Sequence, residues 1–157
     1  MLRHRSLFPP FAVLATLALV AAGCTAGTSA SASASAGSTA TTVNVTLQEF
    51  SVIPDPTSAP AGDITFHVTN AGPDDIHEFV VFKTDLAPDA LPTADDGSVD
   101  ESGEGVELIG EIEDIAVDAS GDLTEPLEAG SYVLICNIVE SGEVHYELGM
   151  RTAFTVE

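Results

Sequence analysis

The chain has 157 residues, of which 25 are Asp or Glu and only 4 are Lys or Arg, so its formal net charge is −21 at pH 7. Nucleic acid and anionic lipid surfaces would repel such a chain, because both bind proteins by attracting basic side chains. Two cysteines are too few for a disulfide-dense scaffold.

The first 23 residues have the features of a secretory signal peptide. Arg3 and Arg5 precede a largely apolar stretch, residues 7–20, and the small residues 21–23 lead into Cys24. A positive start, a short apolar core and a small-residue cleavage site predict export, and the apolar stretch is shorter than the roughly 20 residues that a spanning helix needs.

The Ala-Ala-Gly-Cys ending resembles a bacterial lipobox, in which the cysteine is acylated after cleavage. The resemblance implies a lipid anchor on Cys24 and a location on the extracytoplasmic face of the cytoplasmic membrane. The alternative is an ordinary signal peptide cleaved nearby, which would leave Cys24 as a free thiol.

Residues 24–42 are predicted to be a tether. After Cys24 they consist of Ala, Ser, Thr and Gly, a composition that cannot bury a core and is typical of flexible linkers. Cleavage would remove both early arginines and no acid, leaving Lys83 and Arg151 as the only strong bases. Residues 43–157 are enough for one compact domain.

Within this domain, short runs alternate between apolar and polar residues or are rich in β-branched and aromatic residues. Clusters of Gly, Pro, Asn and Asp separate them; the runs are residues 43–53, 64–69, 76–82, 106–112, 132–139 and 152–156. This pattern predicts an all-β domain, an antiparallel sandwich or barrel. His67 alternates with apolar neighbours, so we expect it on the surface.

Residues 85–100 do not fit the strand pattern. They are rich in Pro, Ala, Gly and acidic residues, with Leu86 and Leu91 as the only sizeable apolar anchors, and they predict a long excursion between strands with room for one short helical turn. Acidic residues continue to position 114. A calcium loop is one interpretation, but the ligand spacing of an EF-hand is absent, which favours a solvated acidic face that could also steer a basic partner.

Four residues could bind a metal. His77 follows a turn-forming cluster, residues 70–75, while Cys136, His145 and Met150 lie near the C-terminal end. One thiolate, two imidazoles and one thioether form the ligand set of a blue-copper site. Each also has an ordinary interpretation: Cys136 as a small buried side chain, Met150 as a core residue, His77 as a hydrogen-bonding group at a strand end, and His145 as an exposed loop residue.

Residues 43–157 resemble a cupredoxin of the plastocyanin, azurin and sulfocyanin type. The first histidine ligand matches His77 in His-Glu-Phe-Val-Val, and the strand-end cysteine matches Cys136 in Tyr-Val-Leu-Ile-Cys-Asn. His145 and Met150 match the loop ligands in His-Tyr-Glu-Leu-Gly-Met. The resemblance implies a Greek-key β-sandwich that holds one type 1 copper ion.

The resemblance also implies the surroundings of the metal. The backbone N–H of Glu78 and one near Asn137 would point at the sulfur of Cys136, Phe79 and Leu148 would exclude water, and His145 would be the solvent-near ligand and electron exit. The eight residues between Cys136 and His145 are more than is usual in the family. We interpret Gly142 and the polar Glu140, Ser141 and Glu143 as an insertion that bulges outward without displacing the ligands.

These observations favour a membrane-tethered carrier of single electrons between partners outside the cytoplasmic membrane, docking on a redox protein with a basic surface. A copper storage or delivery protein without redox turnover is the first alternative, and a metal-free β-sandwich that binds other proteins is the second. No enzyme activity is expected, because the paired histidines of multicopper enzymes, a nucleophile elbow, a phosphate loop and a zinc-hydrolase motif are all missing from the sequence.

Overall fold

The computed structural model describes residues 40–157. The predicted signal peptide, Cys24 and almost all of the predicted tether lie outside the described residues. Within residues 40–157, no helix has both the length and the apolar character required to cross a membrane.

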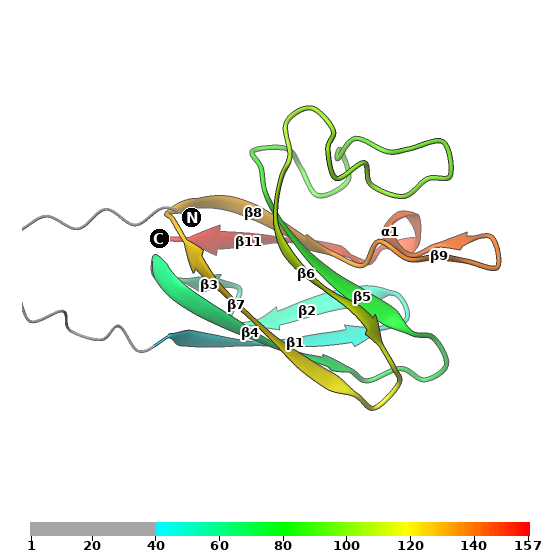
Figure 1. Cartoon of the computed structure of the whole chain (residues 1–157), viewed down its shortest axis with the longest axis horizontal. Coiled ribbons are helices and arrows are strands. Elements are labelled where there is room, and N and C mark those ends of the chain that lie inside the picture. Colours follow the sequence, from blue (N-terminus) through cyan, green and yellow to red (C-terminus); the bar gives the residue numbers. More distant parts are fainter. Residues whose placement is uncertain (1–39) are drawn as a thin grey trace, which may run out of the picture. The chain divides into compact units, whose positions relative to one another are not determined.

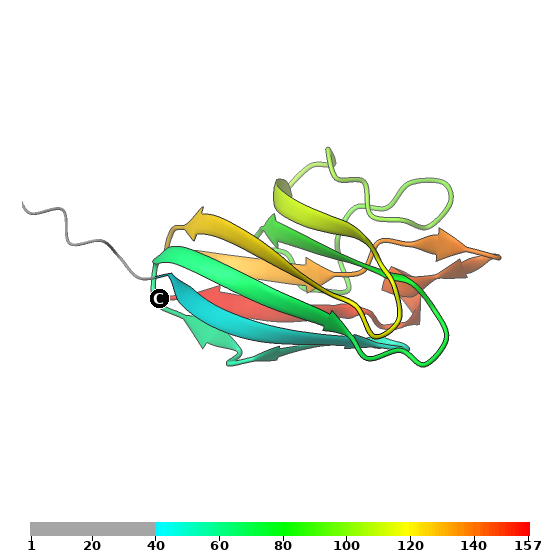
Figure 2. The ribbon, with the colours of Figure 1, turned by 60° about the horizontal axis from the view of Figure 1, so that its bottom comes forward.

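The described residues form two facing β-sheets (Figures 1 and 2). The first has the order β2-β1-β4-β7 and the second β3-β11-β8-β5-β6. The strands of the first sheet are β1 (Thr41–Gln48), β2 (Ser51–Asp55), β4 (Gly62–Asn70) and β7 (Ser120–Leu127). Those of the second are β3 (Ser58–Ala59), β5 (His77–Lys83), β6 (Glu107–Ile115), β8 (Gly130–Ile135) and β11 (Arg151–Val156).

Three short elements complete the fold between β8 and β11. They are β9 (Val139–Glu140), β10 (Glu143–Val144) and the single helical turn α1 (His145–Leu148). The all-β prediction is therefore confirmed, and the fold is a β-sandwich.

The core lies between the two sheets and follows from the two-residue period of the strands. In β1, every second side chain is buried from Val43 to Leu47, while those between point outward. Phe66 of β4 reaches the opposite sheet, with ring centroids 5.4 Å from Phe79 and 5.5 Å from Phe154. Such aromatic pairs stabilise the sandwich beyond the area they bury.

The middle of β5 is buried on both of its faces, which explains why residues 79–82 are continuously apolar rather than alternating. Phe79 and Val81 belong to the main core. Val80 and Phe82 belong to a second cluster that includes Leu91 and further apolar residues of the excursion and of the ligand end. The excursion between β5 and β6 thus covers the outer face of the second sheet.

Two features differ from the sequence prediction. The sheets are mixed rather than purely antiparallel, because β1 pairs with β4 in parallel and β11 pairs with β3 in parallel. Apolar alternation reports which face is buried but not the direction of the neighbouring strand. The excursion contains no helical turn; its regular contact is an isolated antiparallel bridge between Thr93 and Val99.

The strand β7 is absent from the predicted elements. Its buried residue in the sandwich is Leu127, and its other side chains are exposed or partly exposed. It contains Gly121 and Pro126, and its apolar side chains are those of Leu123 and Leu127, so it lacks the β-branched and aromatic composition that predicted the other long strands.

The two ends of the sandwich carry different elements. β1 begins and β11 ends at one end of the sandwich, while the β4–β5 turn, the β9–β10 hairpin and α1 lie at the other (Figure 1). The four candidate ligand residues all belong to this second end, referred to below as the ligand end.

Candidate metal centre

His77 is delivered by a turn that one buried asparagine organises. The side chain of Asn70 donates hydrogen bonds to the carbonyls of Asp75 and Ile115, each at 2.9 Å, and accepts one from the N–H of Gly72 at 2.8 Å. Gly72 has a φ of 39°, and a Cβ there would lie 2.8 Å from Val117. The turn is therefore closely specified, and it leads into a fully buried His77 at the start of β5.

Cys136 directly follows β8 and is fully buried. The backbone N–H of Glu78 donates to its Sγ at 3.2 Å, as predicted. Burial raises the pKa of the Cys136 thiol to about 11, while the backbone N–H groups of Glu78 and Ile138 act in the opposite direction. The second predicted N–H, expected near Asn137, is thus that of Ile138.

The long loop before His145 is a β-hairpin. β9 and β10 pair through Val139–Val144 and Glu140–Glu143, and the two residues between them, Ser141 and Gly142, have φ angles of 53° and 89°. Positive φ at both positions is typical of the tight turns that suit a two-residue hairpin. The hairpin projects from the ligand end (Figure 2), and the N–H of His145 bonds to the carbonyl of Ile138 across its base at 3.0 Å.

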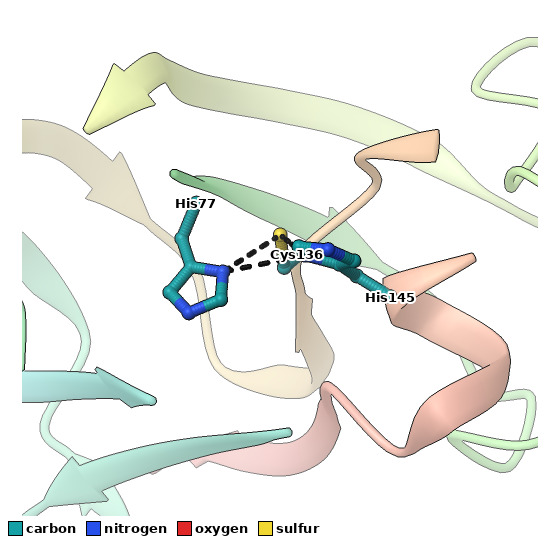
Figure 3. A group of neighbouring side chains, drawn as sticks. All are labelled: His77, Cys136 and His145. Atoms are coloured by element: carbon teal, nitrogen blue, oxygen red, sulfur yellow. Dashed lines mark hydrogen bonds between the residues drawn. The ribbon is translucent and has the colours of Figure 1, made fainter. Parts of the chain in front are cut away.

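Three donor atoms from distant parts of the chain meet in the interior (Figure 3). Nδ1 of His77 lies 3.3 Å from Nδ1 of His145 and 3.9 Å from Sγ of Cys136. Sγ of Cys136 lies 3.4 Å from Nδ1 of His145. The centre of this triangle is roughly 2 Å from each corner, close to the length of a metal–imidazole bond and slightly short of a metal–thiolate bond.

Met150, the fourth candidate, is fully buried and is tied to two of the others by its backbone. Its N–H donates to the carbonyl of His145 and its carbonyl accepts from the N–H of Cys136, both at 3.0 Å. Gly149 makes this path possible, because it ends α1 with a φ of 120° and passes close to the carbonyl of Phe50.

Aromatic and apolar groups close the centre. The ring of Phe50 meets the His145 ring edge-on at a centroid distance of 5.3 Å, and Phe79 is fully buried. The water-excluding role predicted for Leu148 is wrong, because this residue is 46% exposed. Leu148 ends the short helix on its outer side, and Phe50, which the sequence did not single out, packs against His145 instead.

His145 is only 1% exposed, yet it borders a surface pocket of about 240 Å³. We call this the acidic pocket, because its other lining residues are Asp74, Asp75, Ile76, Glu140, Ser141 and Glu143. His67, in contrast, lies on the surface as predicted, with its Nδ1 2.6 Å from a carboxylate oxygen of Asp122.

Comparison of the structure with solved proteins identifies its fold. It superposes on auracyanin from Roseiflexus castenholzii with a TM-score of 0.54 and 21% identity, covering 75% of this chain and 98% of that one. Auracyanin A of Chloroflexus aurantiacus, described as a "blue" copper protein, gives 0.50 and 18%, covering 76% and 100%. Reduced rusticyanin gives 0.50 and 20%, covering 74% and 77%.

The chain has the cupredoxin fold. No protein-family model and no curated protein matches the sequence, so the assignment comes from the arrangement of its strands. The four candidate ligand residues lie at one end of this cupredoxin sandwich.

The donor set fits copper better than zinc. A structural zinc site needs four strong ligands, usually Cys, His or carboxylate, whereas this cluster provides Cys136 and two histidines with a thioether residue beside them. Three strong donors in a plane with a weak methionine are typical of a blue-copper site. The residues present in this cupredoxin therefore fit the copper ion that the fold implies.

A carboxylate that the sequence analysis did not identify faces the far side of His77. Oε1 of Glu49 lies 3.8 Å from Nε2 of His77. Burial lowers the pKa of His77, as does the neighbouring His145, while Glu49 opposes them. Burial also opposes ionisation of Glu49, but hydrogen bonds from the backbone of Asp75 and Asp74 outweigh it and leave the pKa of Glu49 below its ordinary value. No residue spacing could have revealed this contact, because Glu49 belongs to the β1–β2 turn.

A second cluster consists of the carboxylates of Glu78, Glu101 and Glu111, whose oxygens lie within 4.8 Å of one another. Burial and the repulsion of the other carboxylates raise the pKa of Glu78 to about 7, and the pKa of Glu111 is raised for the same reasons. All three remain partly or fully exposed, which agrees with the predicted solvated acidic face.

Proposed function

We propose that this cupredoxin is a type 1 copper protein that carries single electrons between partner proteins. The observation that carries the proposal is the buried triangle of donor atoms from His77, Cys136 and His145. These three residues would hold the ion, and the thioether of Met150 would serve as a weaker fourth donor. Bound copper would supply a one-electron couple between Cu(II) and Cu(I).

The protein contributes a rigid and dry environment. The backbone N–H of Cys136 donates to the carbonyl of Met150. This hydrogen bond lies next to the antiparallel pair of β8 and β11, between the end of β8 and the beginning of β11. The N–H of Glu78 stabilises negative charge on the sulfur of Cys136. His77 begins β5, Cys136 directly follows β8 and Met150 directly precedes β11, so packed strands fix these residues. They would need little rearrangement when the charge at the centre changes, which favours fast electron transfer.

Burial supports electron transfer over storage or delivery of copper. A protein that hands over its metal needs ligands that a partner can reach, whereas the exposure of His77, Cys136 and His145 is 1% or less. The long loop that could have made the site flexible is a closed hairpin in the structure.

The electron route and the partner surface are part of the proposal. Among the three clustered ligands, His145 borders the acidic pocket, so we assign it the role of electron exit. The acidic pocket is rimmed by four carboxylates, two from the turn before His77 and two from the hairpin. A redox protein with a basic surface would complement this rim.

We also propose that a lipid on Cys24 holds the domain at the outer face of the cytoplasmic membrane. The lipobox-like ending and the Ala/Ser/Thr/Gly composition of residues 25–42 support this proposal. β1 begins at the end of the sandwich opposite to the ligand end (Figure 1). A tether attached there would leave the ligand end free for partners, at a local concentration set by its reach.

The decisive experiment is titration of the purified mature chain with Cu(II). We expect an intense visible band from charge transfer between the Cys136 sulfur and copper, narrow copper hyperfine splitting, and saturation at one ion per chain. The Cys136→Ala variant should lack the band. Tight but colourless binding of Cu(I) alone would favour storage or delivery, and no binding of either ion would leave a metal-free sandwich.

Fractionation of cells tests the anchor separately. The native chain should be found with membranes, and Cys24→Ala should release it in soluble form outside the cytoplasm. Membrane association that survives the substitution would contradict lipid anchoring without affecting the copper assignment.

A further inference from the structure

Two buried atoms at the ligand end lack a hydrogen-bond partner. Within residues 40–157, these are Nε2 of His77 and Oε2 of Glu49. His77 is fully buried and the side chain of Glu49 is 12% exposed. Buried polar atoms without partners are rare in folded proteins and require an explanation. Here they belong to facing groups, since the other oxygen of Glu49 lies 3.8 Å from Nε2.

The carboxylate of Glu49 is held in place by the turn that delivers His77. Its Oε1 accepts hydrogen bonds from the backbone N–H of Asp75 at 2.8 Å and of Asp74 at 3.1 Å. The same side chain therefore fixes the turn and faces the imidazole that follows it. On the opposite side of the ring, Nδ1 faces the sulfur of Cys136 and Nδ1 of His145.

We propose that Glu49 is a positioning residue for the metal centre, whose carboxylate accepts the hydrogen on Nε2 of His77 and so leaves Nδ1 free to bind the ion. This inference rests on the proposed copper function. A neutral imidazole carries its hydrogen on one nitrogen and can bind a metal only through the other. Metal-binding histidines usually donate the second N–H to a carboxylate or carbonyl.

A hydrogen bond between Nε2 of His77 and Oε2 of Glu49 would give both unpaired atoms a partner. The separation of 3.8 Å is that between Nε2 of His77 and Oε1 of Glu49, and it exceeds a hydrogen bond by about 1 Å. Oε2 belongs to the same carboxylate, so a rotation of the carboxylate together with a tilt of the ring would bring Oε2 to Nε2. Oε1 already serves two backbone N–H groups, so the unpartnered Oε2 is the acceptor with spare capacity. With one oxygen on the turn and one on the ring, both ends of the carboxylate are satisfied.

The position of the charge has a consequence for the metal. A carboxylate bonded to a ligand histidine makes the imidazole a stronger donor and favours the more highly charged state of the ion. Cu(II) is therefore favoured over Cu(I), and the reduction potential is lowered. A residue that only stabilised the turn would have no such effect, which separates the two roles.

The first test compares the reduction potentials of the native chain, Glu49→Gln and Glu143→Gln. Glutamine keeps an oxygen for the turn but loses the charge. We expect Glu49→Gln to retain the visible band and to change the ratio of oxidised to reduced protein about tenfold toward the reduced form at fixed ambient potential, or about 59 mV for one electron. Glu143 borders the acidic pocket, so its substitution removes an equal charge near His145 and should change the ratio about twofold at most. Equal shifts in the two variants would overturn the proposal.

The second test needs no copper. In the metal-free mature chain at pH 8, ¹⁵N chemical shifts of the His77 ring should show the hydrogen on Nε2, and Glu49→Leu should abolish that preference. An unchanged preference in Glu49→Leu would overturn the proposal. If Glu49→Leu does not fold, the potential of Glu49→Gln decides. A native chain that shows the Nε2 hydrogen but never turns blue would refute the copper function while leaving the positioning role of Glu49 in place.

Discussion

Met150 illustrates how a candidate ligand residue can be selected by residue type before its geometry is known. It is the only methionine outside the predicted signal peptide, and it follows His145 with four residues between them. In the structure its backbone joins it to both Cys136 and His145, so the residue remains in place whatever its side chain is. Substitution can therefore change the donor atom without dismantling the loop.

We predict that Met150→Leu binds copper and stays blue but has a higher reduction potential than the native chain. Leu has nearly the volume of Met, so the cost to folding should be below about 1.5 kcal/mol. Loss of the thioether removes electron density that favours Cu(II). Redox titration with optical detection measures the change. A potential equal to or below the native value would contradict the proposal that the thioether of Met150 is a donor to the ion.

His77, Cys136 and His145 could be predicted from the sequence, because thiol and imidazole side chains are uncommon in this chain and occur in a recognisable order. The sequence could not reveal Glu49. That residue belongs to the β1–β2 turn and reaches His77 only because the β4–β5 turn folds against it. Contacts between two turns leave no period or motif in a single sequence. The sequence also did not reveal the contact of Phe50 with His145 or the exposure of Leu148, because both depend on the path of α1.

At the scale of elements, alternation predicted which residues are buried. It predicted neither the direction of neighbouring strands nor the existence of β7. Val43, Val45 and Leu47 alternate and are buried, whereas the parallel pairing of β1 with β4 depends on the connection through β3. The excursion was located correctly as a non-strand segment. The sequence did not show that the excursion covers the second sheet, because the residues that anchor it come from the ligand end. The hydroxyl of Tyr146 donates to the carbonyl of Pro88 and accepts from the N–H of Leu91.

Asn137 is the second anchor of the excursion. Its Oδ1 accepts from the N–H of Val99 at 2.7 Å, and its Nδ2 donates to the carbonyl of Val99 at 3.1 Å and to Glu101 at 3.2 Å. The residue after the cysteine thus holds the centre of the excursion as a neighbouring strand would.

We predict that Asn137→Ala lowers the free energy of unfolding by about 1–3 kcal/mol, because it leaves buried groups of Val99 without partners. Hydrogen exchange of residues 91–101 should accelerate more than that of the strands. Urea denaturation and hydrogen exchange measure the two effects. Asn44→Ala is the control, since Asn44 is exposed on β1. Exchange in residues 91–101 no faster than in the native chain would show that Asn137 does not anchor the excursion.

Ionisation of the acidic face over β5 and β6 lowers the stability of the folded chain in a pH-dependent way. Burial and the charges of Glu101 and Glu113 raise the pKa of Glu111 above its ordinary value. The folded chain therefore holds this proton more tightly than the unfolded chain, and the contribution of Glu111 to stability falls as the pH rises above about 4.5.

We predict that Glu111→Gln stabilises the copper-free chain at pH 8 and has less effect at pH 5, where the native side chain is more often protonated. The gain should be a few tenths of a kcal/mol, because the side chain is exposed and solvent screens its charge. Urea denaturation at the two pH values measures it, with Glu104→Gln as the control outside the cluster. A larger gain at pH 5 than at pH 8 would reverse the sign and refute the argument.

At the scale of the whole molecule, charge and topology act together. The described domain carries almost all of its charge as carboxylates, with Lys83 and Arg151 as the only strong bases from residue 40 onward. Lys83 is paired with Glu128 at 2.8 Å, on the strand end away from the ligands. Arg151 lies at the ligand end, with its guanidinium 5.0 Å from the centroid of the Tyr146 ring, but the acidic pocket itself is lined by four carboxylates and no Lys or Arg. A basic partner would therefore be attracted to the pocket that borders His145.

We predict that electron transfer to a small redox protein with a lysine-rich face slows about tenfold between 10 and 150 mM salt, because screening weakens steering between opposite charges. Glu143→Gln should lower the second-order rate constant at low salt and flatten its salt dependence, since Glu143 borders the acidic pocket. Asp63→Asn removes the same charge from the start of β4, at the opposite end of the sandwich, and should leave the rate constant nearly unchanged. Stopped-flow measurement of the three proteins gives the comparison. If Asp63→Asn slowed the reaction as much as Glu143→Gln, net charge rather than the acidic pocket would control association, and docking at the His145 end would be refuted.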